Sequence, residues 1–151
     1  MAKKSKDIQY YESVGRRKEA VATARLYIVG KEKSITVDGK KYEPGQIIIN
    51  GEAAETVFPL ETHQKRYMQP IELTNNAGRF VITLKVTGGG TIGQLEAIIH
   101  AISRALNIVD KETFRPVLKA NGLMSRDSRI RERRKVGHGG KARRKKQSPK
   151  R

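Results

Sequence analysis

The stretch RFVITLKVTGGGTIGQLEAIIHAISRALNIV, residues 79–109, holds the clearest secondary-structure pattern of this chain. A period of two in the apolar residues over 79–86 predicts a half-buried strand. After Gly88-Gly89-Gly90 the apolar residues recur at intervals of three and four, which predicts a helix with one apolar face on the core. This face consists of Leu95, Ile98, Ile102, Ala105 and Val109. The stretch therefore predicts a strand followed at once by the main core helix.

The N-terminal part of the chain is predicted to form more strands. Residues 20–29 alternate like residues 79–86, and residues 8–14 precede them. Between these two strands, Gly15-Arg16-Arg17-Lys18 is expected to form the connection of a hairpin, a loop with three positive charges. Residues 34–37 predict a further short strand, which ends at the tight turn Asp38-Gly39.

Short helices are expected on both sides of the core elements. Upstream, helical segments are predicted at residues 52–57 and 61–68, separated by Pro59 and stopped by Pro70. Downstream, Asp110 is positioned to cap a second helix that breaks near Pro116 and ends at Asn121-Gly122. Aspartate is a preferred capping residue, and glycine after a helix accepts the positive φ that ends it.

Charge divides the chain into two parts. Residues 121–151 hold 13 Lys and Arg against two acidic residues, Asp127 and Glu132, a net charge of +11. Residues 1–120 hold 19 basic and 13 acidic residues, a net charge of +6. The C-terminal part has too few large apolar residues to offset the entropy lost on folding. We therefore expect a globular body at 1–120 and a basic tail at 121–151 that is disordered until it binds RNA.

The overall charge indicates a polyanionic partner. Among 151 residues, 32 are Lys or Arg and 15 are Asp or Glu, so the net charge is +17. Nucleic acid is the first candidate and an anionic membrane the second. The tail has neither an aromatic residue nor Leu after Met124, and its many arginines bind phosphate through a planar fork, so RNA is favoured over a lipid surface.

Other classes of protein are disfavoured by what the sequence lacks. It has no cysteine, which excludes disulfides and thiolate chemistry. It has no apolar stretch of the roughly 20 residues that a spanning helix needs and no secretory signal, so we expect a cytoplasmic protein. His63, His100 and His138 lie in unrelated segments, and His100 is expected to form an exposed pair with Glu96, four residues earlier on one helix. We predict no catalytic residue, no metal site and no cofactor.

The glycine-rich segment is the one motif that suggests an enzyme. Gly88-Gly89-Gly90-Thr91-Ile92-Gly93 fits the pattern G-x-G-x-x-G between a strand and a helix. Dinucleotide binding also needs a second parallel strand after the helix, and the sequence predicts a helix there. A nucleotide-dependent enzyme that uses the Gly88–Gly93 loop is therefore the weaker alternative. Two interpretations of the loop remain: a tight turn that lets the helix pack close to the sheet, and a helix N-terminus that holds an RNA phosphate.

The order of several short motifs resembles a known family. These motifs are Gly15-Arg16-Arg17-Lys18, Ala20-Val21-Ala22, Gly88-Gly89-Gly90, Gly93-Gln94, Ser103-Arg104-Ala105-Leu106, Arg126-Asp127-Ser128-Arg129, Glu132-Arg133-Arg134-Lys135-Val136-Gly137, Lys141-Ala142-Arg143-Arg144 and Lys150-Arg151. Together they resemble the bacterial-type ribosomal protein S9 family of the small subunit, nearly from end to end. The segment 32–46 is longer than is usual in that family and includes an apparent extra strand.

The resemblance implies a fold and a set of partners. The fold would be an α+β two-layer sandwich like the second domain of ribosomal protein S5, a four-stranded mixed sheet backed by helices, with a long extended basic C-terminal tail. The protein would lie in the head of the small subunit, bound to 16S-type rRNA and to neighbouring head proteins. Its tail would reach the P-site tRNA, a role that falls on Lys150 and Arg151.

The remaining basic residues of the hairpin and the tail are the candidates for rRNA binding. They are Arg16, Arg17, Lys18, Arg126, Arg129, Arg133, Arg134, Lys135, Lys141, Arg143, Arg144, Lys145 and Lys146. Binding is expected through phosphate and RNA shape, since the chain has only eight aromatic residues with which to stack bases. We expect no membrane partner and no small-molecule substrate.

Overall fold

A computed structural model describes residues 3–5, 8–29, 34–37 and 39–136 of the chain. Its strands are β1 (Lys3–Ser5), β2 (Ile8–Arg17), β3 (Ala20–Ile28), β4 (Ile35–Val37), β5 (Lys40–Tyr42), β6 (Ile47–Ile49), β7 (Glu52–Ala53) and β8 (Phe80–Thr87). Its helices are α1 (Ala54–Val57), α2 (Glu61–Leu73), α3 (Thr91–Val109) and α4 (Lys111–Ala120).

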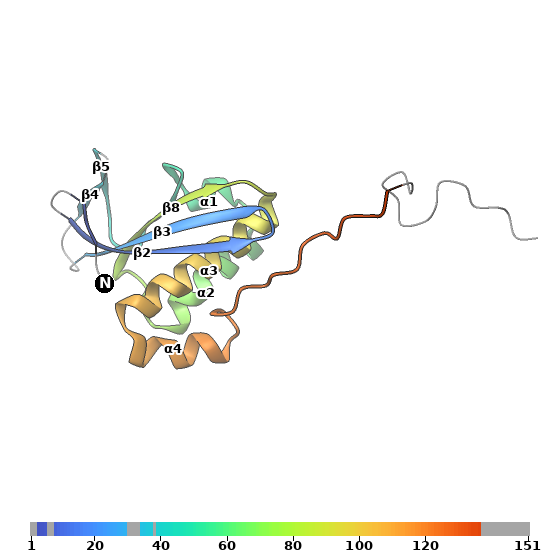
Figure 1. Ribbon diagram of the computed structural model, residues 1–151. Helices are drawn as coiled ribbons and strands as arrows, with labels where there is room; N and C mark the ends of the chain where they lie inside the picture. Colours follow the sequence, from blue (N-terminus) through green and yellow to red (C-terminus); the bar gives the residue numbers. More distant parts are fainter. Residues whose placement is uncertain (1–2, 6–7, 30–33, 38, 137–151) are drawn as a thin grey trace, which may run out of the picture.

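The described residues form a mixed sheet with helices on one face (Figure 1). The strand order is β1-β2-β3-β8-β6-β7, and only β6 and β8 pair in parallel. The predicted α+β class is thus confirmed. The resemblance implied four strands, but the sheet has six, with the short strands β1 and β7 at its two edges. The apparent extra strand in segment 32–46 is the separate β4–β5 hairpin.

The core lies between the sheet and α3. The predicted strands at 20–29 and 79–86 are confirmed as β3 and β8, and the predicted core helix as α3. Leu95, Ile98 and Ile102 of α3 are all fully buried, and α2 and α4 complete the helical layer. The cap is also confirmed, since Asp110 Oδ1 accepts hydrogen bonds from the backbone N–H groups of Glu112 and Thr113.

The predicted loop at residues 15–18 is wrong, because Arg16 and Arg17 belong to β2 and pair with Val21 and Ala20 of β3. The turn is limited to Lys18-Glu19, with Lys18 at φ 50°. Gly15 is a close-approach residue inside the strand: a Cβ atom there would lie 2.1 Å from the carbonyl oxygen of Ala97 on α3.

The helix stops predicted from proline are also wrong. Helix α2 continues through Pro70 to Leu73, and α4 continues through Pro116 to Ala120. Proline removes one hydrogen bond of the helix ladder, but the next turn of each helix packs on the core, through Ile71 in α2 and Leu118 in α4. Burial of those side chains outweighs the lost bond. The first predicted helical segment is shorter than expected, because residues 52–53 form β7.

The glycine-rich segment packs closely against the start of β3. A Cβ atom on Gly88 would lie 2.5 Å from the carbonyl oxygen of Glu19, and one on Gly89 would lie 2.9 Å from the Ala20 side chain. The tight-turn interpretation is therefore confirmed. Helix α3 leads into α4 and not into a parallel strand, so the dinucleotide-binding unit is not formed.

Candidate nucleic-acid interface

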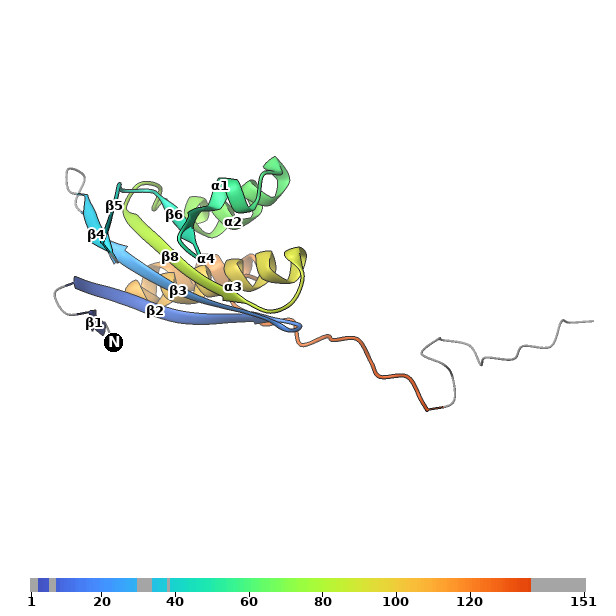
Figure 2. The same cartoon turned by 90° about the horizontal axis from the view of Figure 1, so that it is seen from above.

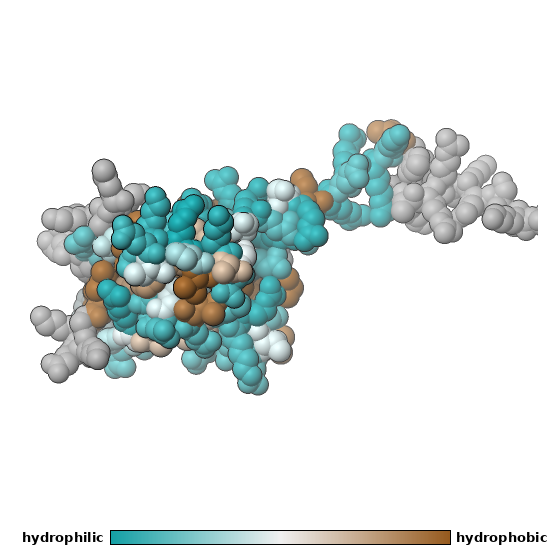
Figure 3. Space-filling model, turned by 90° about the horizontal axis from the view of Figure 1, so that it is seen from below, coloured by the Kyte–Doolittle hydropathy of each residue, from teal (hydrophilic) through white to brown (hydrophobic). Residues whose placement is uncertain are grey.

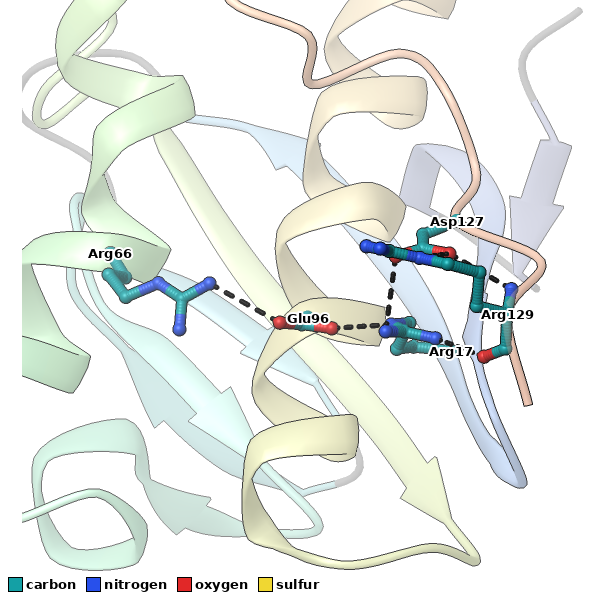
Figure 4. Close-up of polar contacts among 5 residues, drawn as sticks. All are labelled: Arg17, Arg66, Glu96, Asp127 and Arg129. Carbon is teal, nitrogen blue, oxygen red and sulfur yellow. Dashed lines mark hydrogen bonds and ion pairs between the residues drawn. The ribbon is translucent and has the colours of Figure 1, made fainter. Parts of the chain in front are cut away.

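Arg17 lies at the centre of a network that joins the tail to the body (Figure 4). Its Nε atom donates to Glu96 Oε2 of α3 at 2.6 Å, and a terminal nitrogen lies 3.1 Å from Asp127 Oδ2. The other terminal nitrogen donates to the carbonyl oxygen of Arg129 at 2.5 Å. Arg66 of α2 adds an ion pair to Glu96 at 3.6 Å. The Arg17 side chain is only 12% exposed, so its charge is neutralised inside the protein.

Asp127 holds the residues that follow it through hydrogen bonds and ion pairs. It accepts a hydrogen bond from the backbone N–H of Arg129 at 2.9 Å. It also forms an ion pair with the Arg129 guanidinium at 2.7 Å. Hydrogen bonding to Arg129 first, with the charge of Arg17 as a smaller cause, holds the pKa of this carboxyl well below its usual range. Asp127 therefore remains charged at neutral pH, and it is the anion on which the start of the tail is fixed.

Apolar contacts fix the same segment just upstream. Gly122, at φ 71°, reverses the chain after α4, and the backbone N–H of Leu123 donates to the Leu118 carbonyl at 3.0 Å. The side chains of Leu123 and Met124 then pack against the core. Residues 122–129, which we call the tail base, are thus held on the body by both apolar and ionic contacts.

Beyond the tail base the described chain runs away from the body (Figures 1 and 2). Residues 125–135 form no helix. Every cation of this extended segment is exposed: Arg126, Arg129, Arg131, Arg133, Arg134 and Lys135. Figure 3 shows the segment as mainly hydrophilic, with Ile130 and Val136 as its large exposed apolar residues.

The structure separates the predicted rRNA-binding residues into three groups. Arg16, Lys18 and the tail cations up to Lys135 are exposed, whereas Arg17 is engaged by Glu96 and Asp127. Lys141, Arg143, Arg144, Lys145, Lys146, Lys150 and Arg151 lie outside the described residues, as does His138.

Sequence reasoning missed Arg131, Arg66 and Arg104. Arg131 is as exposed as the other cations of this extended segment. Arg66 and Arg104 carry no local signal, because only the packing of α2 and α3 against their neighbours brings them to this surface.

The expected surface pair of His100 with Glu96 is wrong. Both carboxylate oxygens of Glu96 are taken by Arg17 and Arg66, and His100 is half-buried. Burial, followed by the positive charge of Arg104, lowers the pKa of His100, while a hydrogen bond to the backbone of Met124 acts in the opposite direction. His100 is therefore a neutral side chain beneath the tail base. Within the described part of the chain, no three potential metal ligands come together.

A known sequence family matches most of the chain. A model of the family described as Ribosomal protein S9/S16 matches residues 15–151, from the glycine where β2 meets α3 through the whole tail. The chain belongs to this family. Members of the S9 family are structural components of the ribosome, so the chain is not an enzyme and the alternative based on the glycine loop is wrong. No helix among the described residues is long and apolar enough to cross a membrane.

Curated relatives agree with the family model. The chain is 44% identical to the small ribosomal subunit protein uS9 of Maridesulfovibrio salexigens over 90% of its own length and 92% of that protein. It is 43% identical to the protein of the same name from Solidesulfovibrio magneticus, over 87% and 90% of the two chains. For the one from Leifsonia xyli, the identity is 40% over 83% of this chain and 66% of the relative. The S9 resemblance seen in the short motifs is thus confirmed.

Proposed function

We propose that the chain is a structural protein of the small ribosomal subunit that binds 16S-type rRNA in the head and contacts P-site tRNA through Lys150 and Arg151. The observation that carries the rRNA part is the run of exposed cations beyond the tail base, which leaves the body in an extended form. An extended chain presents guanidinium groups on all sides, and each can hold a phosphate through two parallel hydrogen bonds. The family and the names of the relatives support the small-subunit location.

The two parts of the chain have different tasks in this proposal. The body at 1–120 has the fold of the second domain of ribosomal protein S5 and packs against rRNA and neighbouring head proteins. The tail at 121–151 is fixed on the body at its base, and the rest of it becomes ordered as its 11 remaining basic residues meet phosphates. The relatives come from bacteria, where ribosomes work in the cytoplasm, and this supports the same location for the chain.

The tRNA part rests on the family resemblance and on the two terminal cations. A guanidinium on an anticodon-stem phosphate in a poorly hydrated site contributes roughly 1.5 to 3 kcal/mol. The tail has many other cations for rRNA, and each exposed one contributes about 1 kcal/mol or less. Loss of Lys150 and Arg151 should therefore affect tRNA much more than assembly.

Reconstituted small subunits test both parts. A chain that ends at Ile130 keeps the Arg17 network but lacks 11 of the 13 basic tail residues, and it should be incorporated poorly. A chain without Lys150 and Arg151 should be incorporated normally and release P-site tRNA about tenfold faster. The matched control is Lys145→Gln with Lys146→Gln, which removes two charges but keeps the terminus. An unchanged release rate, or the same increase in the control, would contradict the tRNA role.

A further inference from the structure

A cationic pocket lies beside the Arg17 network and is not used by it. It is a cavity of about 320 Å³ lined by Val14 and Arg16 of β2, His100 and Arg104 of α3, and Arg126 of the tail base. Three arginines from three separate segments thus meet at one hollow, and none of the lining residues is acidic. Such a grouping is unfavourable by itself, because like charges repel one another.

The carboxylates that line the neighbouring hollow form ion pairs with other arginines. Glu96 and Asp127 line the adjoining hollow together with Arg16 and Arg126, but their ion pairs go to Arg17, Arg66 and Arg129. Within the part of the chain that the structure describes, no ion pair joins Arg16, Arg104 or Arg126 to a carboxylate. The positive charge of the pocket is therefore uncompensated.

Arg104 and His100 give the pocket a fixed wall. One terminal nitrogen of Arg104 donates to the carbonyl oxygen of Val14, at a part of the β2 edge where no strand pairs. This bond fixes the guanidinium and leaves its other N–H donors available. His100, which is half-buried, lines the pocket beside it.

We propose that the cationic pocket binds one phosphate group of the RNA backbone. The inference rests on the proposed rRNA binding, and it adds a defined site on the body for a single phosphodiester. Guanidinium groups from β2, α3 and the tail base would share the phosphate oxygens, as planar donors do at phosphate sites.

The site depends on the Arg17 network, because Arg126 directly precedes Asp127 in the chain. The contact between Arg17 and Asp127 brings Arg126 to the pocket, so a carboxylate assists the binding of an anion. This dependence is opposite to simple electrostatics, in which removal of any negative charge strengthens phosphate binding.

The first test asks whether loss of the Asp127 carboxylate weakens or strengthens phosphate binding. Inorganic phosphate is titrated into the full chain, and the side-chain Nε–H signals of Arg16, Arg104 and Arg126 are followed by NMR. Asp127→Asn should weaken phosphate binding about tenfold, although it raises the net charge. The matched control is Glu72→Gln, which removes an exposed carboxylate of α2 and should not weaken binding. Equal or tighter binding by Asp127→Asn, or no saturable shift of the three signals in the unaltered chain, would overturn the pocket.

A second pair of variants covers the case in which Asp127→Asn disturbs the fold. Arg16 is exposed and takes part in none of the ion pairs described above, so Arg16→Gln should fold normally, and Arg115→Gln on α4 is its matched control. Only Arg16→Gln should weaken phosphate binding, again about tenfold, and it should weaken binding of 16S-type rRNA more than the control does. Equal effects of the two variants on rRNA would overturn the pocket and leave the proposed function intact. A complete lack of rRNA binding by the unaltered chain would instead overturn the proposed function.

Discussion

At the scale of residues, Arg16 and Arg17 show how neighbours in a basic motif differ in role. Both belong to the motif Gly15-Arg16-Arg17-Lys18, and from the sequence both were predicted to bind rRNA. In β2, Arg17 meets Glu96 and Asp127, whereas the neighbouring Arg16 remains exposed and lines the hollow beside them. No local pattern predicts this, because the partners lie 79 and 110 residues away in the chain. The part of the site that depends on such pairs could not be predicted from the sequence.

We therefore predict different effects of the two arginines on stability. Arg17→Gln removes a 12% exposed guanidinium and leaves two carboxylates with fewer partners, so it should lower the free energy of unfolding by about 1.5 to 3 kcal/mol. Arg16→Gln should change it by less than about 0.5 kcal/mol. Urea unfolding at neutral pH measures both. Equal losses would show that the Arg17 network does not stabilise the body.

At the scale of elements, the long periodic segments were predictable and their junctions were not. The strands β3 and β8 and the helix α3 follow from apolar periodicity alone, because each buries one continuous face. The end of β2 was misassigned because glycine next to charged residues is typical of turns. In the structure, Gly15 is required by the close approach of α3, which the Ser13 hydroxyl also marks by donating to the Ala101 carbonyl at 2.5 Å.

The contact of β2 with α3 predicts opposite outcomes for two glycines. Gly15→Ala places a Cβ atom 2.1 Å from the Ala97 carbonyl oxygen, so α3 must move, and the protein should lose about 3 kcal/mol of stability or more. Gly93→Ala is the matched control inside α3, with its nearest neighbours at 3.6 Å and a gain of about 0.5 to 1 kcal/mol expected from helix propensity. Thermal unfolding of both variants measures the difference. Tolerance of Gly15→Ala would show that the strand and helix are not as close as described.

At the scale of the whole molecule, the chain separates charges that stabilise the protein from charges left for a partner. The tail base is fixed on the body by Asp127 and by the apolar side chains of Leu123 and Met124. Beyond it, residues 130–136 carry four basic residues and one acidic residue, all exposed. The composition of the tail predicted a polyanionic partner from the sequence alone. The position of the tail base required the fold, because it depends on α3, α4 and β2 together.

If the tail beyond its base carries most of the RNA binding, the salt dependence of that binding should be lost with it. Affinity for 16S-type rRNA is measured across a range of salt concentrations for the full chain and for the chain that ends at Ile130. Each phosphate neutralised contributes about 0.7 to 0.9 to the slope of log affinity against log salt, so a tail that covers on the order of eight phosphates gives a steep slope. We predict that the chain ending at Ile130 loses most of this slope while it unfolds at the same urea concentration as the full chain. An unchanged slope in the shortened chain would show that the body alone binds the RNA and would contradict the account.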